Sequence, residues 1–502
     1  MFNNACVQIL QKMDKSELRA FKAFIKQREA QKKQENSLFN YLYNCHPEFK
    51  EKDLDQDKIL SIFKESNWAY PGKRLSDIGN NLTKIIEDFL VEQALKKNWQ
   101  EYEFLLAFEY SRLGLPDLLD RKIDSYLNAP EKLTLKEEAD EEALEGNKLD
   151  QEKKKESDRG GIDVWYHWNL YRMYHLRYYS RDTIKAASGE GNLDLSLEQL
   201  EQATLAARLR IALEMASLKV INGKEPLLTF SNEELTALKT KLSEKETYLY
   251  LYCHAYDLLA NPDDQKFYDF KAKLLRLGKQ LSRDEQGNLL TPLINYASVA
   301  IRNGKEQFYA EASFLHRYGL ETGLLLQDEK ITPELLTTVI NITCEAQELS
   351  EAEALLEKWT PNLAAGLKEE AVVASKGRIQ FFSKQYKESA AQFSTIKRFS
   401  NHLMELAART STVQSYFEME EYILLDSFCE SFAKALSRSE DRFSQQHRDS
   451  YGNFVKMVQA LVSAKLDPNT NLAEKRNKLQ RKLEKYSPIV CKKWLKEKIE
   501  DL

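Results

Sequence analysis

Apolar residues recur every three or four positions along most of the chain, which is the spacing of one face of an α-helix. A clear run lies in the first hundred residues, and similar runs follow it up to the C-terminus. Its members are Leu75, Ile78, Leu82, Ile85, Ile86 and Phe89. The pattern predicts an amphipathic helix at each such run, and helices as the main structure of the whole chain.

Residue chemistry marks where several of these helices begin and end. Capping residues predict helix starts at Asp14, Ser196, Ser231 and Thr332, the last with proline in the first turn. Ahead of Ser196 we expect a loop over 188–194. The tetrapeptide Asn-Gly-Lys-Glu follows an apolar helix at 222–225 and again at 303–306. Its glycine suits the left-handed conformation that commonly ends a helix, so both copies are predicted helix stops.

A pattern of two short helices repeats in the second half of the chain. Its clearest copy is GRIQFFSKQYKESAAQF at 377–393, in which a helix bearing Phe381 and Phe382 meets a polar turn at 384–385. Related patterns lie about 37 residues earlier and about 36 residues later. A period near 35 residues built from two helices is typical of stacked helical-repeat proteins.

The same stretch resembles the tetratricopeptide-repeat family. In that family a small residue lies midway along the first helix, an aromatic residue opens the second, and a small residue follows. The matching positions are Gly377, Tyr386, Ser389 and Phe393, whereas the neighbouring copies carry Ile340, Val413 and Leu425 where small residues belong. The chain also resembles all-helical bacterial proteins that end in a helix rich in Trp and Leu, a resemblance that implies no activity.

Together these patterns predict an all-α protein, a tetratricopeptide-like α-solenoid with an N-terminal helical bundle and a C-terminal capping helix. The predicted parts are a bundle at 1–98, a first helix pair at 99–130, a charged flexible excursion at 131–163, helical repeats at 164–470 and basic capping helices at 471–502. The excursion is alternatively a regulatory segment that binds a partner. The basic C-terminus is alternatively an amphipathic helix that docks on a partner or on an anionic surface.

The most aromatic stretch of the chain is predicted to be a helix at 164–179. Val164, Trp168, Tyr171, His175 and Tyr178 fall on one face of it, and other aromatic residues extend beyond that face. A helix that is apolar on most sides usually packs in a core, which is our prediction. The alternative is an aromatic cleft for a base, a sugar or a peptide.

Composition narrows the class of protein. Gly and Pro together make up 28 of 502 residues, too few for a turn-rich β protein, and the net charge of −5 gives no electrostatic reason to expect nucleic acid as the main partner. The six cysteines are scattered with no Cys-x-x-Cys pair, which favours buried free thiols in a reducing cytoplasm. We expect no secretory signal and no membrane span.

The sequence contains no recognisable catalytic motif, such as His-Glu-x-x-His, Gly-x-Ser-x-Gly or a glycine-rich dinucleotide loop. We therefore expect no enzyme activity, no cofactor and no metal. The predicted function is that of an interaction scaffold or adaptor for a protein or peptide partner. The alternative is a regulator that acts on nucleic acid or transcription through the N-terminal bundle or the basic C-terminus.

The resemblance implies where a partner would bind. In tetratricopeptide arrays the first helix of each pair lines the concave face, and the residues beside its small position point inward. The corresponding residues are Asn341, Glu345, Arg378, Phe382, Gln414 and Glu418. A mixture of charges, amides and an aromatic side chain suits an extended peptide. Alternatively Phe382 only packs against the neighbouring pair and the others are ordinary surface positions. In both cases replacing Asn341, Arg378 and Gln414 is expected to change stability little.

Overall fold

The structure is a computed structural model, and it describes 4–27, 33–64, 74–129, 162–179, 190–222, 225–327, 330–363, 368–396, 399–438, 443–467 and 471–502. Throughout these ranges the regular elements are helices, and β pairing is confined to two isolated bridges, one of which joins Ile331 to Leu363. The prediction of an all-α protein is confirmed. The chain divides into two compact units, Met1–Thr204 and Leu205–Leu502, which we describe separately.

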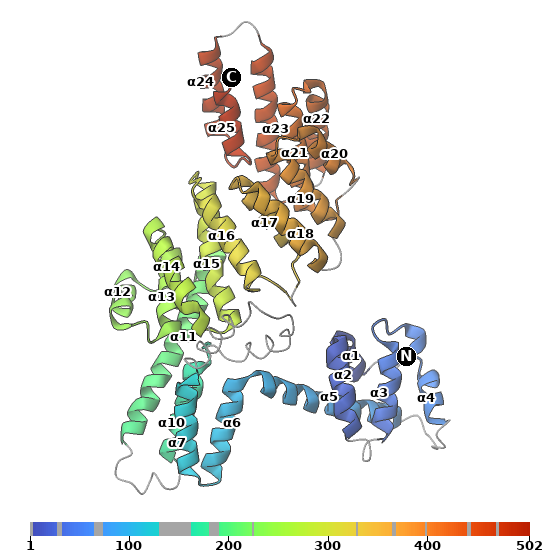
Figure 1. The fold of residues 1–502 in the computed structure, drawn as a ribbon, viewed down its shortest axis with the longest axis vertical. Helices are drawn as coiled ribbons and strands as arrows, with labels where there is room; N and C mark the ends of the chain where they lie inside the picture. The colour runs from blue at the N-terminus through green and yellow to red at the C-terminus, as the bar shows by residue number, and fades with distance from the viewer. Residues whose placement is uncertain are drawn as a thin grey trace. The chain divides into compact units, whose positions relative to one another are not determined.

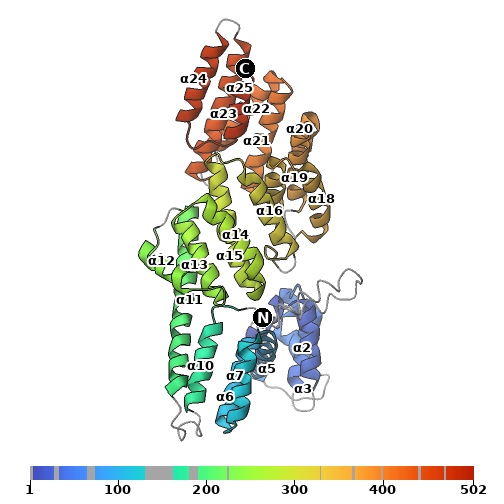
Figure 2. The same cartoon turned by 60° about the vertical axis from the view of Figure 1, so that its left-hand side comes forward.

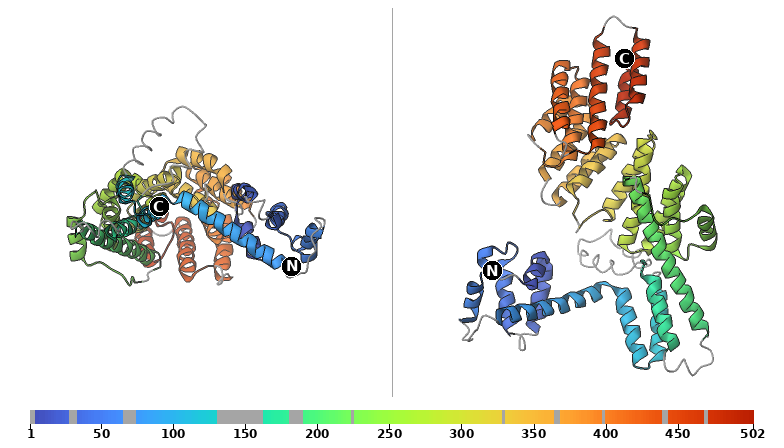
Figure 3. Two further views of the ribbon diagram at one scale, coloured as in Figure 1. Left: turned by 90° about the horizontal axis from the view of Figure 1, so that it is seen from below. Right: turned by 180° about the vertical axis from the view of Figure 1, so that it is seen from behind.

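The first unit begins with helices around a core of their own. They are α1 (Ala5–Lys12), α2 (Lys15–Gln27), α3 (Lys33–Cys45), α4 (Gln56–Lys64) and the long α5 (Arg74–Lys97), which Figure 3 shows as one continuous helix. Their buried apolar residues form a single cluster from Cys6 to Phe89. At its centre the rings of Phe21 and Phe39 meet edge to face, with centroids 4.8 Å apart. The predicted start of α2 is also present, because Asp14 accepts from the amide of Glu17 at 2.8 Å and the Glu17 carboxylate accepts from the amide of Asp14 at 3.0 Å.

The rest of the first unit contains α6 (Trp99–Arg112), α7 (Pro116–Leu127), α10 (Tyr166–Tyr179) and the start of α11 (Glu190–Asn222), which continues into the second unit. Two predictions are wrong here. Helix α11 already begins at Glu190, so 190–194 is helix and Ser196 lies inside it. The helix α10 exists, but it buries a different face, made up of Tyr166, His167, Asn169, Leu170, Met173 and Tyr174.

The exposed face of α10 carries residues that the apolar spacing predicts to be buried. Trp168 is 39% exposed, and His175 is also exposed. Aromatic residues lie on all sides of this helix, so apolar spacing alone did not distinguish the packed face. The predicted excursion at 131–163 lies outside the described residues except for its last two positions.

The second unit consists of successive helices that pack on their neighbours (Figure 1). They are the rest of α11, α12 (Asn232–Lys241), α13 (Thr247–Ala260), α14 (Asp264–Leu277), α15 (Arg283–Arg302), α16 (Phe308–Glu321), α17 (Pro333–Glu345), α18 (Leu349–Trp359), α19 (Lys368–Phe382), α20 (Tyr386–Ser394), α21 (His402–Glu418), α22 (Tyr422–Arg438), α23 (Gln445–Leu466), α24 (Leu472–Lys485) and α25 (Lys492–Glu500). The first helices of three successive pairs, α17, α19 and α21, also pack directly on one another.

One turn geometry joins successive helices in both units. In each case a residue with positive φ follows the first helix, and the next amide donates back to a carbonyl five residues earlier, as in a Schellman motif. The residues with positive φ are Gly114, Gly304, Gln347, Lys384 and Glu420. The five-residue hydrogen bonds are 2.9–3.1 Å long. The predicted stop at 303–306 is confirmed, and its counterpart at 222–225 is only partly described.

Two predicted helix starts are confirmed in the second unit. Ser231 and Glu234 form a reciprocal capping box at the start of α12. Thr332 caps α17 by accepting from the amide of Leu335, with Pro333 in the first turn.

The C-terminal helices complete the second unit. Helices α23, α24 and α25 lie side by side in both Figure 1 and Figure 2. Leu479 and Leu483 of α24 join a core cluster with Trp494, Leu495 and Ile499 of α25. The C-terminus therefore covers apolar residues of α21 and α23, such as Phe417 and Phe454.

Candidate functional site

Arg378 lies at the centre of the predicted binding residues. It projects from α19, and its guanidinium donates to Asn341 of α17 at 2.7 Å and to Glu345 of α17 at 2.6 Å. On the other side it donates to Gln414 and to Ser411 of α21, at 3.2 Å in both cases. One side chain thus connects three helices that are far apart in the sequence. We call Arg378 and these four acceptors the Arg378 cluster.

Phe382 lies beside the Arg378 cluster, one turn further along α19. The guanidinium carbon of Arg378 lies 4.5 Å from the centroid of the Phe382 ring. Stacking of this kind suits the flat, weakly hydrated guanidinium better than it would suit a lysine ammonium. The structure therefore brings together five of the six predicted residues: Asn341, Glu345, Arg378, Phe382 and Gln414.

The environment of the cluster differs from the expected row of surface positions. Gln414 is only 2% exposed, and the side chains of Arg378 and Glu345 are 13% and 20% exposed. Asn341 remains exposed. Because Arg378 already donates to four acceptors, it braces α17, α19 and α21 against one another. The premise that these are surface positions is therefore wrong for Arg378 and Gln414, and we now predict that replacing Arg378 lowers stability.

The sixth predicted residue, Glu418, binds the C-terminal helix instead. It ends α21, and its carboxylate accepts from the indole nitrogen of Trp494 at 2.7 Å. It also pairs with the ammonium of Lys498 at 3.1 Å. Burial by itself would lower the pKa of Lys498, but its hydrogen bonds and charge interactions with Glu418 and Asp501 raise the pKa above its usual value.

Helix α25 also reaches the turn between α15 and α16. Lys493 pairs with Glu306 at 3.1 Å, and its ammonium lies 5.7 Å from the centroid of the Tyr309 ring. Burial raises the pKa of Tyr309, and the negative charge of Glu345 adds to this effect. The pKa of Cys491, which immediately precedes α25, is raised by burial to about 12. Its thiol is therefore protonated at neutral pH and is not an activated nucleophile.

Trp494, Lys498 and Ser411 are parts of this site that sequence reasoning missed. Trp494 and Lys498 are spaced four apart, so they lie on one face of a helix, a pattern that is legible in the sequence. Their partner Glu418 lies 76 and 80 residues earlier, and no local pattern indicates that pairing.

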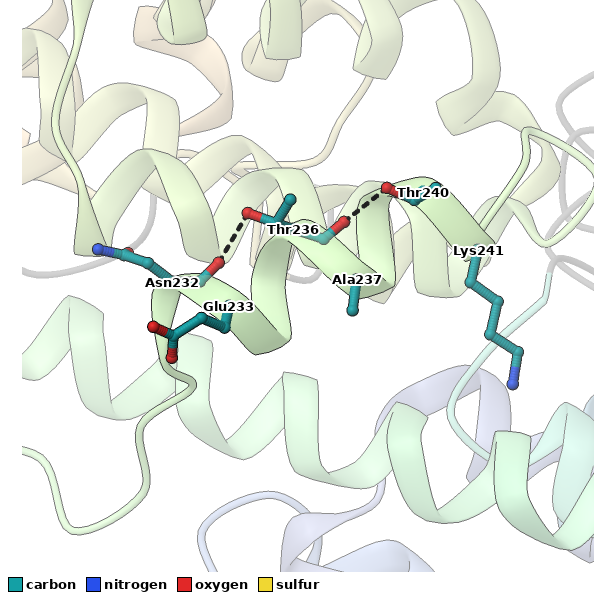
Figure 4. Close-up of a pocket in the computed structure, with 6 residues that line it drawn as sticks. All are labelled: Asn232, Glu233, Thr236, Ala237, Thr240 and Lys241. Atoms are coloured by element: carbon teal, nitrogen blue, oxygen red, sulfur yellow. Dashed lines mark hydrogen bonds between the residues drawn. The ribbon is translucent and has the colours of Figure 1, made fainter.

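A hollow lies along the outer face of α12 (Figure 4). Its lining comes from this one helix: Asn232, Glu233, Thr236, Ala237, Thr240 and Lys241. The hydroxyls of Thr236 and Thr240 donate to backbone carbonyls one turn earlier, at 2.7 and 2.9 Å, and so complete bonds within the helix. With a single helix as its wall, the hollow does not surround a ligand, and we assign it no function.

Two buried carboxylates serve to hold helices together. Asp257 of α13 accepts from Lys239 and from Lys266 of the flanking helices α12 and α14. Burial would raise the pKa of Asp257, but hydrogen bonds led by that of Lys239 lower it below its usual value. Glu285 of α15 is 2% exposed and accepts from Arg210 of α11 at 2.8 Å. Such pairs fix helix positions and offer no open coordination site.

The described part of the chain contains no group of three or more His, Cys, Asp or Glu residues that could hold a metal ion. It also contains no helix with the length and apolar character needed to cross a bilayer. All six cysteines are free, and Cys6, Cys253, Cys344 and Cys429 are buried. Burial raises the pKa of each of these four thiols, to about 12, 11, 12 and 12, respectively.

No protein-family model, no curated protein and no solved structure matches the chain.

Proposed function

We propose that the chain is a non-catalytic interaction scaffold, a tetratricopeptide-like α-solenoid that binds a protein or peptide partner on the face lined by α17, α19 and α21. The observation that carries the proposal is the Arg378 cluster together with Glu418. Residues from three successive first helices converge on one face, and Arg378 fixes their spacing through hydrogen bonds of 2.6–3.2 Å. A rigid row of this kind is what a scaffold needs to recognise one partner, because little order has to be gained on binding.

The face also has the right chemistry for a protein segment. It combines the exposed amide of Asn341 and the carboxylate of Glu418 with the aromatic ring of Phe417. Helix α25 supports the proposal by example, since it lies against this face through a buried tryptophan and two lysine contacts. Recognition of an amphipathic helix in a groove uses the same combination of apolar anchors and flanking charges.

Site-specific photocrosslinking in the native cell tests the proposal. A photoreactive phenylalanine analogue replaces Asn341, which is exposed at the Arg378 cluster, and crosslinked species are identified by mass spectrometry. The matched control places the same analogue at Ile423 of α22, which is 87% exposed and lies on a second helix of a pair. We expect one protein to be crosslinked from position 341 and not from position 423.

The result can also contradict the proposal. Equal yields from the two positions, or crosslinks from position 341 that lead only back to this chain, would reject this face as the binding surface. Crosslinks to nucleic acid would favour the alternative regulator. That alternative is tested by measuring nucleic-acid affinity at increasing salt concentration. Binding through phosphate contacts weakens steeply as salt rises, and the slope depends on the number of contacts.

A further inference from the structure

Helix α25 meets the rest of the second unit in the way a bound helical ligand meets its receptor. Trp494, Leu495 and Ile499 are 9%, 0% and 1% exposed, and they lie with Lys498 on one face of the helix. The Trp494 ring meets the ring of Phe417 edge to face, with centroids 5.3 Å apart. A buried tryptophan surrounded by polar contacts is the usual energetic centre of a protein interface.

Charge complementarity runs along the same contact. Lys493 pairs with Glu306 near one end of α25, and Lys498 pairs with Glu418 near the other end. Glu418 is the last residue of α21, where the helix dipole adds negative potential and favours a cation. The receiving face is therefore acidic and aromatic at the positions where α25 is basic and apolar.

The attachment of α25 rests on a short helix and a small number of buried side chains. The helix has nine residues, follows a short connection from α24 and buries three large apolar side chains. Ordering nine residues costs conformational entropy of the same order as the gain from burying three such side chains. Its docking is therefore sustained largely by the covalent connection, which keeps the local concentration of α25 high.

We propose that α25 is an intramolecular occupant of the binding face, and that the partner is an amphipathic helix that displaces it by presenting Trp-Leu and Lys-Ile at the same spacing. This inference rests on the proposed function, because it names the partner of that surface and its regulation. With α25 in place, Glu418 and Phe417 are already occupied by Trp494. A partner displaces α25 by supplying the same tryptophan, leucine, lysine and isoleucine contacts to Glu418 and the surrounding aromatic core.

The test cuts the connection and measures exchange. A protease site is inserted between Ser487 and Pro488, both of which are exposed, in the otherwise intact chain. The probe is a fluorescent peptide of residues 488–502 carrying Cys491→Ser, and its binding is measured by anisotropy before and after cutting. At micromolar protein, cutting lowers the effective concentration of α25 from about millimolar to micromolar, so the apparent affinity for the probe should rise about 10²- to 10³-fold.

Matched variants show whether the exchange uses the contacts described. A probe with Trp494→Ala, and a chain with Glu418→Gln, should each weaken binding at least about tenfold, since each removes a central contact. Glu421→Gln, in the turn after α21, should leave the affinity unchanged. If the affinity for the probe does not rise after cutting, α25 is a permanent core element. If neither central substitution changes the affinity, the probe does not bind through the contacts of α25, and the inference fails. Dimers of the uncut chain that dissociate on cutting would overturn the inference in favour of exchange of α25 with a second copy of the chain.

The two proposals fail in different ways. The peptide experiment requires no natural partner, so its outcome does not depend on whether a protein crosslinks at position 341. If a protein crosslinks there and the probe does not compete with it, the scaffold stands and α25 is not the occupant that it displaces. If the probe exchanges as expected and position 341 crosslinks no protein, the displaceable helix stands and the proposed function fails.

Discussion

Gly377 shows why a single small residue matters in a helix pair. A Cβ atom built on Gly377 would lie 2.6–2.8 Å from three ring atoms of Phe393, so there is no room for a methyl group at this position. Phe393 is 6% exposed, so its ring has little freedom to move away. The hydroxyl of Ser389 also donates to the Gly377 carbonyl at 2.8 Å. Ser389 and Phe393, which the repeat pattern also singled out, therefore both pack against Gly377.

Gly377→Ala should destabilise the second unit. Alanine favours helix over glycine by up to about 1 kcal/mol, but overpacking in a core costs about 1–3 kcal/mol, so the clash should win. We expect a net loss of about 1–2 kcal/mol, measured as a lower urea midpoint of helical circular dichroism.

Gly452→Ala is the matched control for this substitution. Gly452 lies inside α23, and nothing lies within 4 Å of a Cβ atom built on it. The helix preference then acts alone and should stabilise the protein by about 0.5–1 kcal/mol. Equal effects of the two substitutions would show that the contact with Phe393 is not what requires glycine at position 377.

At the scale of helices, local signals predicted some ends and missed others. Asp14, Ser231 and Thr332 act as predicted because each side chain bonds to an amide within three residues. Ser196 offers the same signal, yet α11 continues through it. A capping residue inside a helix does not end it, so this local signal did not locate the start of α11.

The turns between paired helices show a second limit of local signals. Gly304 was predictable because glycine adopts positive φ at little cost. Gln347 and Glu420 have φ values of 63° and 59° in the same kind of turn, although their side chains disfavour it. Packing of the two helices imposes the conformation there, and packing is not visible in a short stretch of sequence.

Arg378→Ala should release the three helices that Arg378 joins. It would leave the Glu345 carboxylate and the buried amide of Gln414 without their guanidinium donor, and unmatched buried polar groups are costly. Because Glu345 keeps some contact with solvent, we expect the free energy of unfolding to fall by about 2 kcal/mol, which is less than the full cost of an unpaired buried charge.

The measurement is again the urea midpoint, with Lys376→Ala on the exposed side of the same helix as the control. That control should stay within about 0.5 kcal/mol of the unmodified chain. Arg378→Lys should lie between the two, since it keeps the charge and loses the forked donors. An alanine variant as stable as the control would mean that the cluster forms without bracing the helices.

At the scale of the whole chain, composition and periodicity were enough to predict an all-α protein. The six candidate residues came instead from the resemblance to tetratricopeptide repeats, and five of them lie together around Arg378 in the structure. The contact of α25 with Glu418 was not predictable, since it joins residues 76 and 80 positions apart through one tryptophan and one lysine. Pairings of this kind depend on the arrangement of all the intervening helices.

The N-terminal helices offer a test of independence at this scale. Their buried apolar residues form one cluster whose members all lie between Cys6 and Phe89 in the sequence. Asn4 also forms hydrogen bonds of 3.0 Å with Thr83 and Asn80 of α5. A separate core of this size is what an independently folding domain requires. A fragment of residues 1–97 should therefore fold by itself, with helical circular dichroism and a cooperative urea transition.

Phe21→Ala in this fragment distinguishes a packed core from a loose collection of helices. The Phe21 ring is fully buried and contacts the rings of Phe39 and Phe89, with centroids 4.8 and 5.2 Å away. Its removal should cost about 3–5 kcal/mol, most of the stability of a domain this small. Arg19→Ala, at an exposed position of the same helix, should change the midpoint by no more than about 0.5 kcal/mol. A fragment that is helical but melts without cooperativity, or in which both substitutions have equal effect, would mean that the bundle requires the rest of the chain for its packing.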